Sequence, residues 1–208
     1  MHSGVPATIT GHVRCQDRIS KNLIDLALPF PYSILGLWRR DRTSTMILRI
    51  PMKKTIYLDT TIPSYLFDER ESIKTWVDIT KKWWAEERQR FDLWISGETA
   101  AELRNGDYPR KQEVLAFISE IPLLSLETAI IDIAETYLEN YLMPQKLEGD
   151  ALHLAYASYY NMDFLLTWNC NHLANANKKQ HIRIINTRMN LSTPEITTPF
   201  QFFTETKT

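Results

Sequence analysis

Residues 55–66 read TIYLDTTIPSYL, and this stretch decides how the chain folds. Its first four residues are mostly β-branched, aromatic or apolar, which is typical of a short strand. The strand ends directly at the carboxylate of Asp59, and Pro63 stands where the first turn of a following helix is expected. In open parallel sheets, ligands bind outside the carboxyl ends of the strands. The role of Asp59 therefore depends on whether other acids occupy matching positions.

From residue 52 onward, segments with strand-like composition alternate with segments of helical periodicity. We expect strands at 55–58, 91–96, 123–126, 164–168 and 182–185. We expect helices at 62–68, 75–90, 98–104, 109–120, 127–141 and 149–161. This alternation predicts an α/β fold, in which a parallel sheet is covered by helices on both faces.

The expected helix at 75–90 carries three tryptophans at helical spacing, Trp76, Trp83 and Trp84. Lysines and glutamates occupy the other side of this helix, so the pattern is amphipathic. We therefore expect the three tryptophans to lie in the core rather than to form a platform for stacking nucleobases.

The overall charge and the cysteines limit the function classes. The 208 residues carry a net charge of −1, which does not favour strong non-specific binding of nucleic acid but leaves a local basic patch open. Cys15 and Cys170 suggest neither a disulfide framework nor a zinc site, so we expect a reducing, cytoplasmic location. The apolar segment at 23–38 is too short and too interrupted by an aspartate and prolines to cross a membrane.

The first 51 residues differ from the remainder in charge and pattern. Residues 1–51 hold seven basic and three acidic residues, a net charge of +4, while the other 17 basic and 22 acidic residues give 52–208 a net charge of −5. Residues 1–51 also show no sustained helical or strand period. We expect one folded domain at 52–208, preceded by a poorly ordered extension or by a translated stretch upstream of a natural start at Met52. The alternative is a basic arm that binds nucleic acid or a partner.

Further polar side chains follow the other expected strands. Glu98 and Glu102 come after the second strand, Asp150 opens a later helix, and Asn169 follows the strand that ends in LLTW. Because the carboxyl ends of parallel strands share one edge, these side chains are expected to converge with Asp59. Hard carboxylate oxygens select Mg²⁺ or Mn²⁺. Such a site suits the hydrolysis of a phosphodiester bond.

Each acid also has a structural interpretation. Asp59 and Asp150 stand where they could cap helices, and Glu102 in a polar helix is ordinarily only solvated. Taken singly, these alternatives are at least as strong as a functional role. Taken together, three acids at successive strand ends favour a metal site, and spacing alone goes no further.

Four segments of the chain, in order, resemble PIN-domain proteins, and in particular the VapC-like ribonuclease toxins of prokaryotic toxin–antitoxin pairs. These segments are YLDTTIPSYL (57–66), SGETAAELRNGD (96–107), EGDALHLAYA (148–157) and DFLLTWNCNHLANA (163–176). The resemblance covers about residues 53–190 and leaves 1–51 out. It implies a three-layer α/β/α sandwich with a central, mostly parallel sheet.

The resemblance also implies a set of site residues. Asp59, Glu102 and Asp150 match the three family acids, which hold Mg²⁺ or Mn²⁺. Asn169 stands where many family members have a fourth acid, and its implied role is to orient a water or another side chain in catalysis. This departure puts the fourth ligand in doubt, although three acids can suffice, because Mg²⁺ usually takes one or two carboxylates together with phosphate and waters.

The resemblance implies a metal-dependent endoribonuclease that hydrolyses RNA, and we expect an antitoxin partner and a homodimer on the same ground. The interrupted apolar segment at 23–38 gives the separate expectation that the chain does not enter a membrane. The alternative is a catalytically weak PIN-fold module that binds RNA or a protein partner without cleavage. Other phosphate chemistries fit less well. A phosphotransferase with a nucleophilic aspartate would need a second acid at Thr61, and 52–208 contains only three glycines and no glycine-rich phosphate loop.

Overall fold

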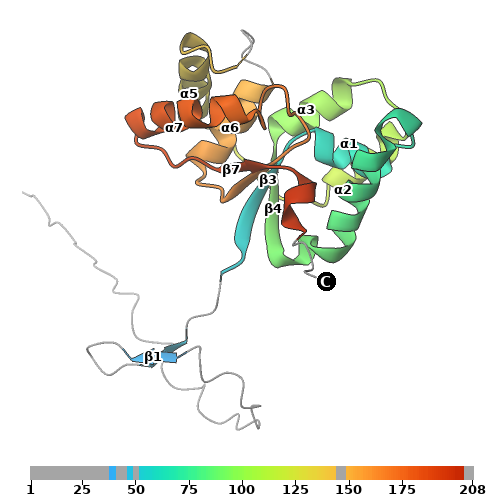
Figure 1. The fold of residues 1–208 in the computed structure, drawn as a ribbon, viewed down its shortest axis with the longest axis horizontal. Coiled ribbons are helices and arrows are strands. Elements are labelled where there is room, and N and C mark those ends of the chain that lie inside the picture. The colour runs from blue at the N-terminus through green and yellow to red at the C-terminus, as the bar shows by residue number, and fades with distance from the viewer. Residues whose placement is uncertain (1–37, 41–45, 49–51, 144–148, 204–208) are drawn as a thin grey trace, which may run out of the picture. The chain divides into compact units, whose positions relative to one another are not determined.

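The computed structural model describes residues 38–40, 46–48, 52–143 and 149–203 (Figure 1). The chain divides into two units, residues 1–51 and 52–208. In the first unit, β1 (Trp38–Arg40) pairs antiparallel with β2 (Met46–Leu48). The expectation of poor order in the rest of this unit lies outside the described residues.

The described part of the second unit contains a five-stranded sheet in the order β5-β4-β3-β6-β7. All neighbouring strands are parallel, which confirms the predicted parallel sheet. The strand that opens TIYLDTTIPSYL is central, so all carboxyl ends meet along one edge with Asp59 in the middle. The strands are β3 (Lys54–Leu58), β4 (Phe91–Ser96), β5 (Leu123–Leu124), β6 (Phe164–Leu166) and β7 (Glu195–Thr197).

Helices cover both faces of this sheet, as Figure 1 shows. One face packs against α1 (Thr61–Phe67), α2 (Lys74–Glu86), α3 (Gly97–Asn105) and α4 (Lys111–Ile118). The other face packs against α5 (Thr128–Glu139), α6 (Asp150–Tyr159) and α7 (Lys179–Arg188). Short 3₁₀ turns complete the described elements: η2 (Glu71–Ile73), η3 (Arg88–Arg90), η4 (Ala176–Lys178) and η5 (Pro199–Phe202).

The central strand β3 shows why the chain forms three layers. Ile56 and Leu58 are fully buried in the core with α1, α2 and α4, whereas Tyr57 is fully buried in the core with α5, α6 and α7. Successive side chains of a strand point to opposite faces, so a run of three buried residues needs a core on each side. This arrangement confirms the expected α/β/α sandwich.

One predicted strand is wrong. Residues 182–185 lie within α7, and the fifth strand is β7, which the sequence did not indicate. Ile182 and Ile185 are buried while the two residues between them are exposed, which is one face of a helix. A four-residue run of this kind is too short for its period to separate helix from strand. The other predicted elements are present, with ends that differ by no more than four residues.

The expectation for the tryptophans of α2 is only partly correct. Trp83 is fully buried, and Trp84 is half-buried against Phe117. Trp76, in contrast, is 46% exposed, so it does not belong to the core. None of the helices in the described ranges is long and apolar enough to cross a membrane.

Because every strand of the five-stranded sheet lies after residue 52, we expect residues 52–208 to fold without 1–51. Limited proteolysis of the full chain should leave a stable fragment that begins near Met52. The purified fragment should unfold cooperatively in urea at the same midpoint as the full chain. A fragment that fails to unfold cooperatively, while the full chain does, would show that residues 1–51 stabilise the domain.

Candidate active site

Asp59 is held firmly at the carboxyl end of β3. It is only 3% exposed, and both of its carboxylate oxygens accept hydrogen bonds. Oδ1 accepts from the backbone N–H of Thr61 at 2.8 Å and from its hydroxyl at 2.5 Å, and Oδ2 accepts from the Thr167 hydroxyl at 2.5 Å. The Thr61 N–H belongs to the first turn of α1. By accepting this N–H, Asp59 also helps to fix the start of a helix, which is the structural role that the sequence left open.

The environment of Asp59 favours a cation nearby. Burial raises the pKa of Asp59, because the ionised carboxylate loses solvation. The positive charge of His153 and the hydrogen bonds from Thr167 and Thr61 oppose this rise without cancelling it. The charged form of Asp59 would therefore gain from a further positive charge at this edge.

Glu102 projects from α3 and is half-buried. Its Oε2 accepts hydrogen bonds from the Thr60 hydroxyl and from Nε2 of His153, the latter at 3.1 Å. Burial alone would raise the pKa of Glu102, but the hydrogen bond and charge of His153 and the bond from Thr60 lower it overall. Glu102 is thus an ionised, partnered carboxylate and not merely a solvated helix residue.

His153 is the site residue that sequence reasoning missed. It is 2% exposed, and its Nδ1 lies 2.8 Å from the Tyr57 hydroxyl. Burial alone would lower the pKa of His153, but Tyr57 and the carboxylates of Glu102 and Asp59 raise it well above 6.5. The available signal was its position three residues after Asp150, because residues at that spacing share a helix face.

A buried hydroxyl network joins this histidine to the sheet. The Tyr57 hydroxyl lies 2.6 Å from Oγ of Ser96 and 3.2 Å from Oγ1 of Thr99. Ser96 in turn accepts the backbone N–H of Thr99 at 3.3 Å and so caps α3. The network fixes the start of α3 against β3, and it thereby sets the position from which Glu102 projects.

Asp150 and Asn169 form a second pair at the same edge. Nδ2 of Asn169 donates to Oδ1 of Asp150 at 2.8 Å. Burial raises the pKa of Asp150, and the negative charge of Glu102 raises it further, because the two carboxylates repel each other. The charges of His153 and His172 and the hydrogen bond from Asn169 oppose this rise.

Gly149 brings the start of α6 close to α3. Its φ of 74° lies in the region that only glycine adopts easily, and its N–H donates to Oε1 of Glu98 at 2.9 Å. A Cβ at this position would lie 3.1 Å from Oε1 of Glu102. Glycine therefore allows the close approach that places Asp150 near Glu102.

The structure brings all four predicted residues to one edge, although not into a finished metal site. Among the described residues, no three acidic, histidine or cysteine side chains are arranged as a metal-binding group. Their donor chemistry fits Mg²⁺ or Mn²⁺, because Asp59, Glu102 and Asp150 offer hard oxygens and two of them carry a pKa raised by burial. In this structure the positive charge among the three carboxylates is that of His153.

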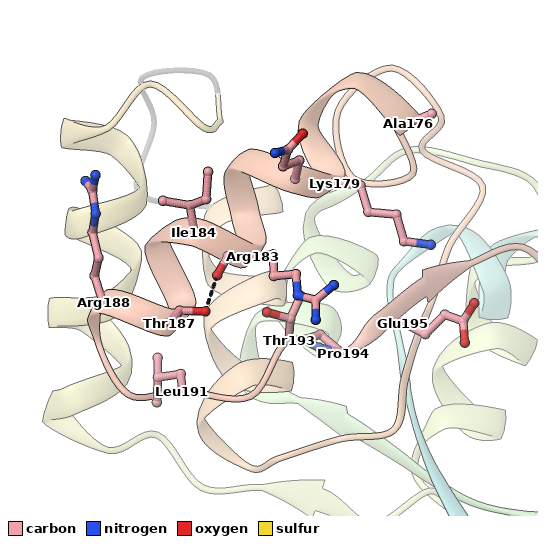
Figure 2. A pocket seen from close by; sticks show the side chains of 11 residues that line it. Ala176, Lys179, Arg183, Ile184, Thr187, Arg188, Leu191, Thr193, Pro194 and Glu195 are labelled. Carbon is pink, nitrogen blue, oxygen red and sulfur yellow. Dashed lines mark hydrogen bonds between the residues drawn. The ribbon is translucent and has the colours of Figure 1, made fainter.

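A separate cavity of about 1100 Å³ lies along α7 (Figure 2). Figure 2 shows Lys179, Arg183 and Arg188 spread along this helix, with Glu195 at the start of β7. These three basic side chains form a local group of positive charge, which an overall net charge of −1 does not exclude. None of the four predicted site residues lines the cavity, so the candidate active site lies elsewhere.

A family model of the PIN domain matches residues 56–177, and the chain therefore belongs to the PIN domain family. This confirms the resemblance on which the site residues were assigned. Among solved structures, the chain is similar to one of VapBC-1 from nontypeable Haemophilus influenzae, with 18% identity over 70% of this chain and 98% of that chain and a TM-score of 0.44. No curated protein matches the chain.

If His153 supplies the positive charge of the metal-free site, His153→Gln should make the site more dependent on a divalent cation. Glutamine retains hydrogen bonding but not charge, so we expect the free energy of unfolding in EDTA to fall by about 1–3 kcal/mol. Added Mg²⁺ should then stabilise the variant more than the wild type. Urea unfolding with and without Mg²⁺ measures both effects.

The matched control is His181→Gln, because His181 is exposed on α7. This variant should unfold like the wild type under both conditions. Equal stabilisation of His153→Gln and wild type by Mg²⁺ would contradict a role of His153 as the internal cation.

Proposed function

We propose that this PIN-domain chain is a metal-dependent endoribonuclease of the toxin type. The observation that carries the proposal is the convergence of Asp59, Glu102 and Asp150 around His153 at the carboxyl edge of the sheet. All three acids come from different elements: Glu102 is hydrogen-bonded to His153, and the charge of the same histidine opposes the rise in the pKa of Asp59 and of Asp150. A fold that only needed helix caps would have no reason to gather one buried and two partly buried carboxylates in this way.

In the proposed reaction, a bound Mg²⁺ or Mn²⁺ supplies charge neutralisation of the scissile phosphate and a more acidic water. The residues of the chain hold and orient the groups around it. Asp59 is fixed by Thr61 and Thr167 and presents a rigid carboxylate at the centre of the edge. Glu102 and Asp150 supply the other two hard donors, and Asn169 orients Asp150 through its amide.

The partners are part of the same proposal. We infer an antitoxin that holds the chain inactive, a homodimer, and a cytoplasmic location. An apolar groove of about 400 Å³ beside the edge strand β5 supports a protein partner, because Leu123 and Leu126 are each 59% exposed there. Leu152 and Tyr156 of α6 line the same groove.

A second candidate function is a PIN-fold module that binds RNA or a protein without cleavage. Two observations favour it. No three acidic, histidine or cysteine side chains among the described residues form a metal-binding group, and Asn169 stands in place of a fourth acid. Titration calorimetry with Mn²⁺ separates the two functions. A ribonuclease should bind the metal and lose this binding in Asp59→Asn, whereas a module without a metal site should show neither.

Asp59→Asn, Glu102→Gln and Asp150→Asn should each abolish metal-dependent RNA cleavage, because each replaces a negatively charged carboxylate with a neutral amide that attracts a divalent cation much less. The fold should persist, since the substitutions keep side-chain size. Asp150→Asn is expected to cost up to about 1 kcal/mol of stability, because Asp150 lies in the first turn of α6, where the helix dipole favours a negative charge. The assay is cleavage of a labelled RNA with and without EDTA.

Asp92→Asn is the matched control, since Asp92 lies on β4 and is exposed. It should cleave like the wild type. Full cleavage by all three site variants, with protein free of contaminating nuclease, would exclude this site.

Asn169→Asp should tighten Mg²⁺ binding and lower metal-free stability. The amide of Asn169 donates to Asp150, so a carboxylate there would lose this bond and repel Asp150. With the metal bound, the same added charge becomes attractive. We therefore expect a lower melting temperature in EDTA and a larger rise on adding Mg²⁺.

Asn171→Asp adds the same charge two residues away at an exposed position and serves as the control. Calorimetry at one pH should give it the affinity of the wild type. Equal affinity for Asn169→Asp and wild type would place Asn169 outside the site.

A further inference from the structure

Trp76 is a large aromatic side chain that the fold leaves in solvent. It lies near the start of α2 and is 46% exposed. Its ring centroid is 6.3 Å from that of Trp168, and the two ring planes are tilted by 40°. The exposed indole and the half-buried indole beside it together offer a flat aromatic surface to a ligand.

Trp168 is fixed to the candidate active site through its backbone. Its N–H donates to Oγ1 of Thr61 at 2.9 Å, and the same hydroxyl donates to Asp59. Trp168 is also followed directly by Asn169, whose amide reaches Asp150. A shift of Trp168 would therefore disturb hydrogen bonds to two of the predicted metal ligands.

The indole of Trp168 is held from the other side by α2. Its Nε1 donates at 2.7 Å to Oγ1 of Thr80, a fully buried residue one turn after Trp76. Trp168 is thus pre-ordered, because it is hydrogen-bonded through both its backbone and its ring, and Trp76 lies beside this fixed ring. A rigid aromatic surface costs little conformational entropy when it binds a flat ligand.

The chain direction places this pair on the same edge as the site. Only the turn η3 separates the end of α2 from the start of β4, so α2 ends at the amino edge of the parallel sheet (Figure 1). The other end of α2, with Trp76, therefore points toward the carboxyl edge. The contact between Trp76 and Trp168, which follows β6, agrees with this placement.

We propose that Trp76, supported by Trp168, stacks on an unpaired nucleobase of single-stranded RNA, next to the phosphate that would be cleaved at the edge formed by Asp59, Glu102 and Asp150. The inference rests on the proposed ribonuclease function and states how that site would bind its RNA substrate. Stacking on an indole suits this purpose, since every base has a flat face and the contact tolerates many sequences. The hydrogen-bonded link from Trp168 to Asp59 favours a nucleobase over a protein partner, because it ties the aromatic surface to the reacting edge.

The test measures binding separately from cleavage. A fluorescently labelled single-stranded oligoribonucleotide is titrated with the full chain in EDTA, and its affinity is read by anisotropy. Trp76→Leu should weaken binding roughly 5- to 100-fold, the range for loss of one stacked base. Trp76→Phe should restore most of the affinity, because it keeps an aromatic face.

Phe200→Leu is the matched control, because Phe200 is an exposed aromatic residue on η5. It should bind as the wild type does. A second readout is the intrinsic tryptophan fluorescence of the protein. Unlabelled oligoribonucleotide should quench this fluorescence in the wild type and quench it less in Trp76→Phe. An oligonucleotide with abasic sugars should bind the wild type and Trp76→Leu equally.

The outcomes distinguish this inference from the proposed function. Absence of metal-dependent RNA cleavage by the wild type would refute the proposed ribonuclease function, yet the metal-free binding loss in Trp76→Leu would still stand as evidence of stacking. Conversely, the Trp76 variants could keep the RNA affinity and the fluorescence quenching of the wild type while cleavage still depends on Asp59. This result would refute stacking on Trp76 and would favour a protein partner for this side chain. An equal loss of affinity for abasic RNA would also overturn it.

Discussion

The buried carboxylate of Asp59 is the constraint on which the rest of this domain depends. An ionised carboxylate that loses water must find hydrogen bonds or a positive charge, or it becomes protonated. Asp59 finds its hydrogen bonds in Thr61 and Thr167, which belong to the start of α1 and to the end of β6. The same three contacts therefore align the central strand, its neighbour and the first helix. These structural contacts are compatible with the proposed role of Asp59 as a metal ligand, so they do not argue against it.

His153 explains how the fold tolerates several acids at one edge. The carboxylates of Asp59, Glu102 and Asp150 all interact favourably with its charge, and the hydroxyl of Tyr57 holds its other nitrogen. Without a cation, three neighbouring carboxylates in a partly buried site would repel one another and lose solvation. Because His153 is fixed in the core, its positive charge reduces the repulsion between these carboxylates whether or not a metal ion is bound. It also limits how strongly the site gains from a divalent ion, because part of the negative charge is already balanced.

Much of this arrangement followed from the sequence, and the exceptions have physical causes. The parallel-strand rule placed Asp59, Glu102 and Asp150 at one edge, because it needs only the order of strands and helices. The strand at 182–185 was wrong, since over so short a run Ile182 and Ile184 fit the strand period while Ile182 and Ile185 fit the helical one. Helical spacing put Trp76 on the apolar side of α2 without showing how far the core extends. His153 was missed because its partners, Tyr57 and Glu102, come from distant segments that only the folded chain brings together.

The choice of an amide at Asn169 fits the same electrostatic argument. The amide of Asn169 donates a hydrogen bond to Asp150 while adding no charge, and the repulsion between Asp150 and Glu102 makes that neutrality valuable. A fourth acid would improve the attraction for a divalent ion but would leave the metal-free edge with one more buried carboxylate. Asn169 and His153 therefore act in the same direction: one withholds a negative charge and the other adds a positive one. If the proposed metal site is correct, the two residues together favour the folded metal-free domain with its acids in place, at the expense of affinity for the divalent ion.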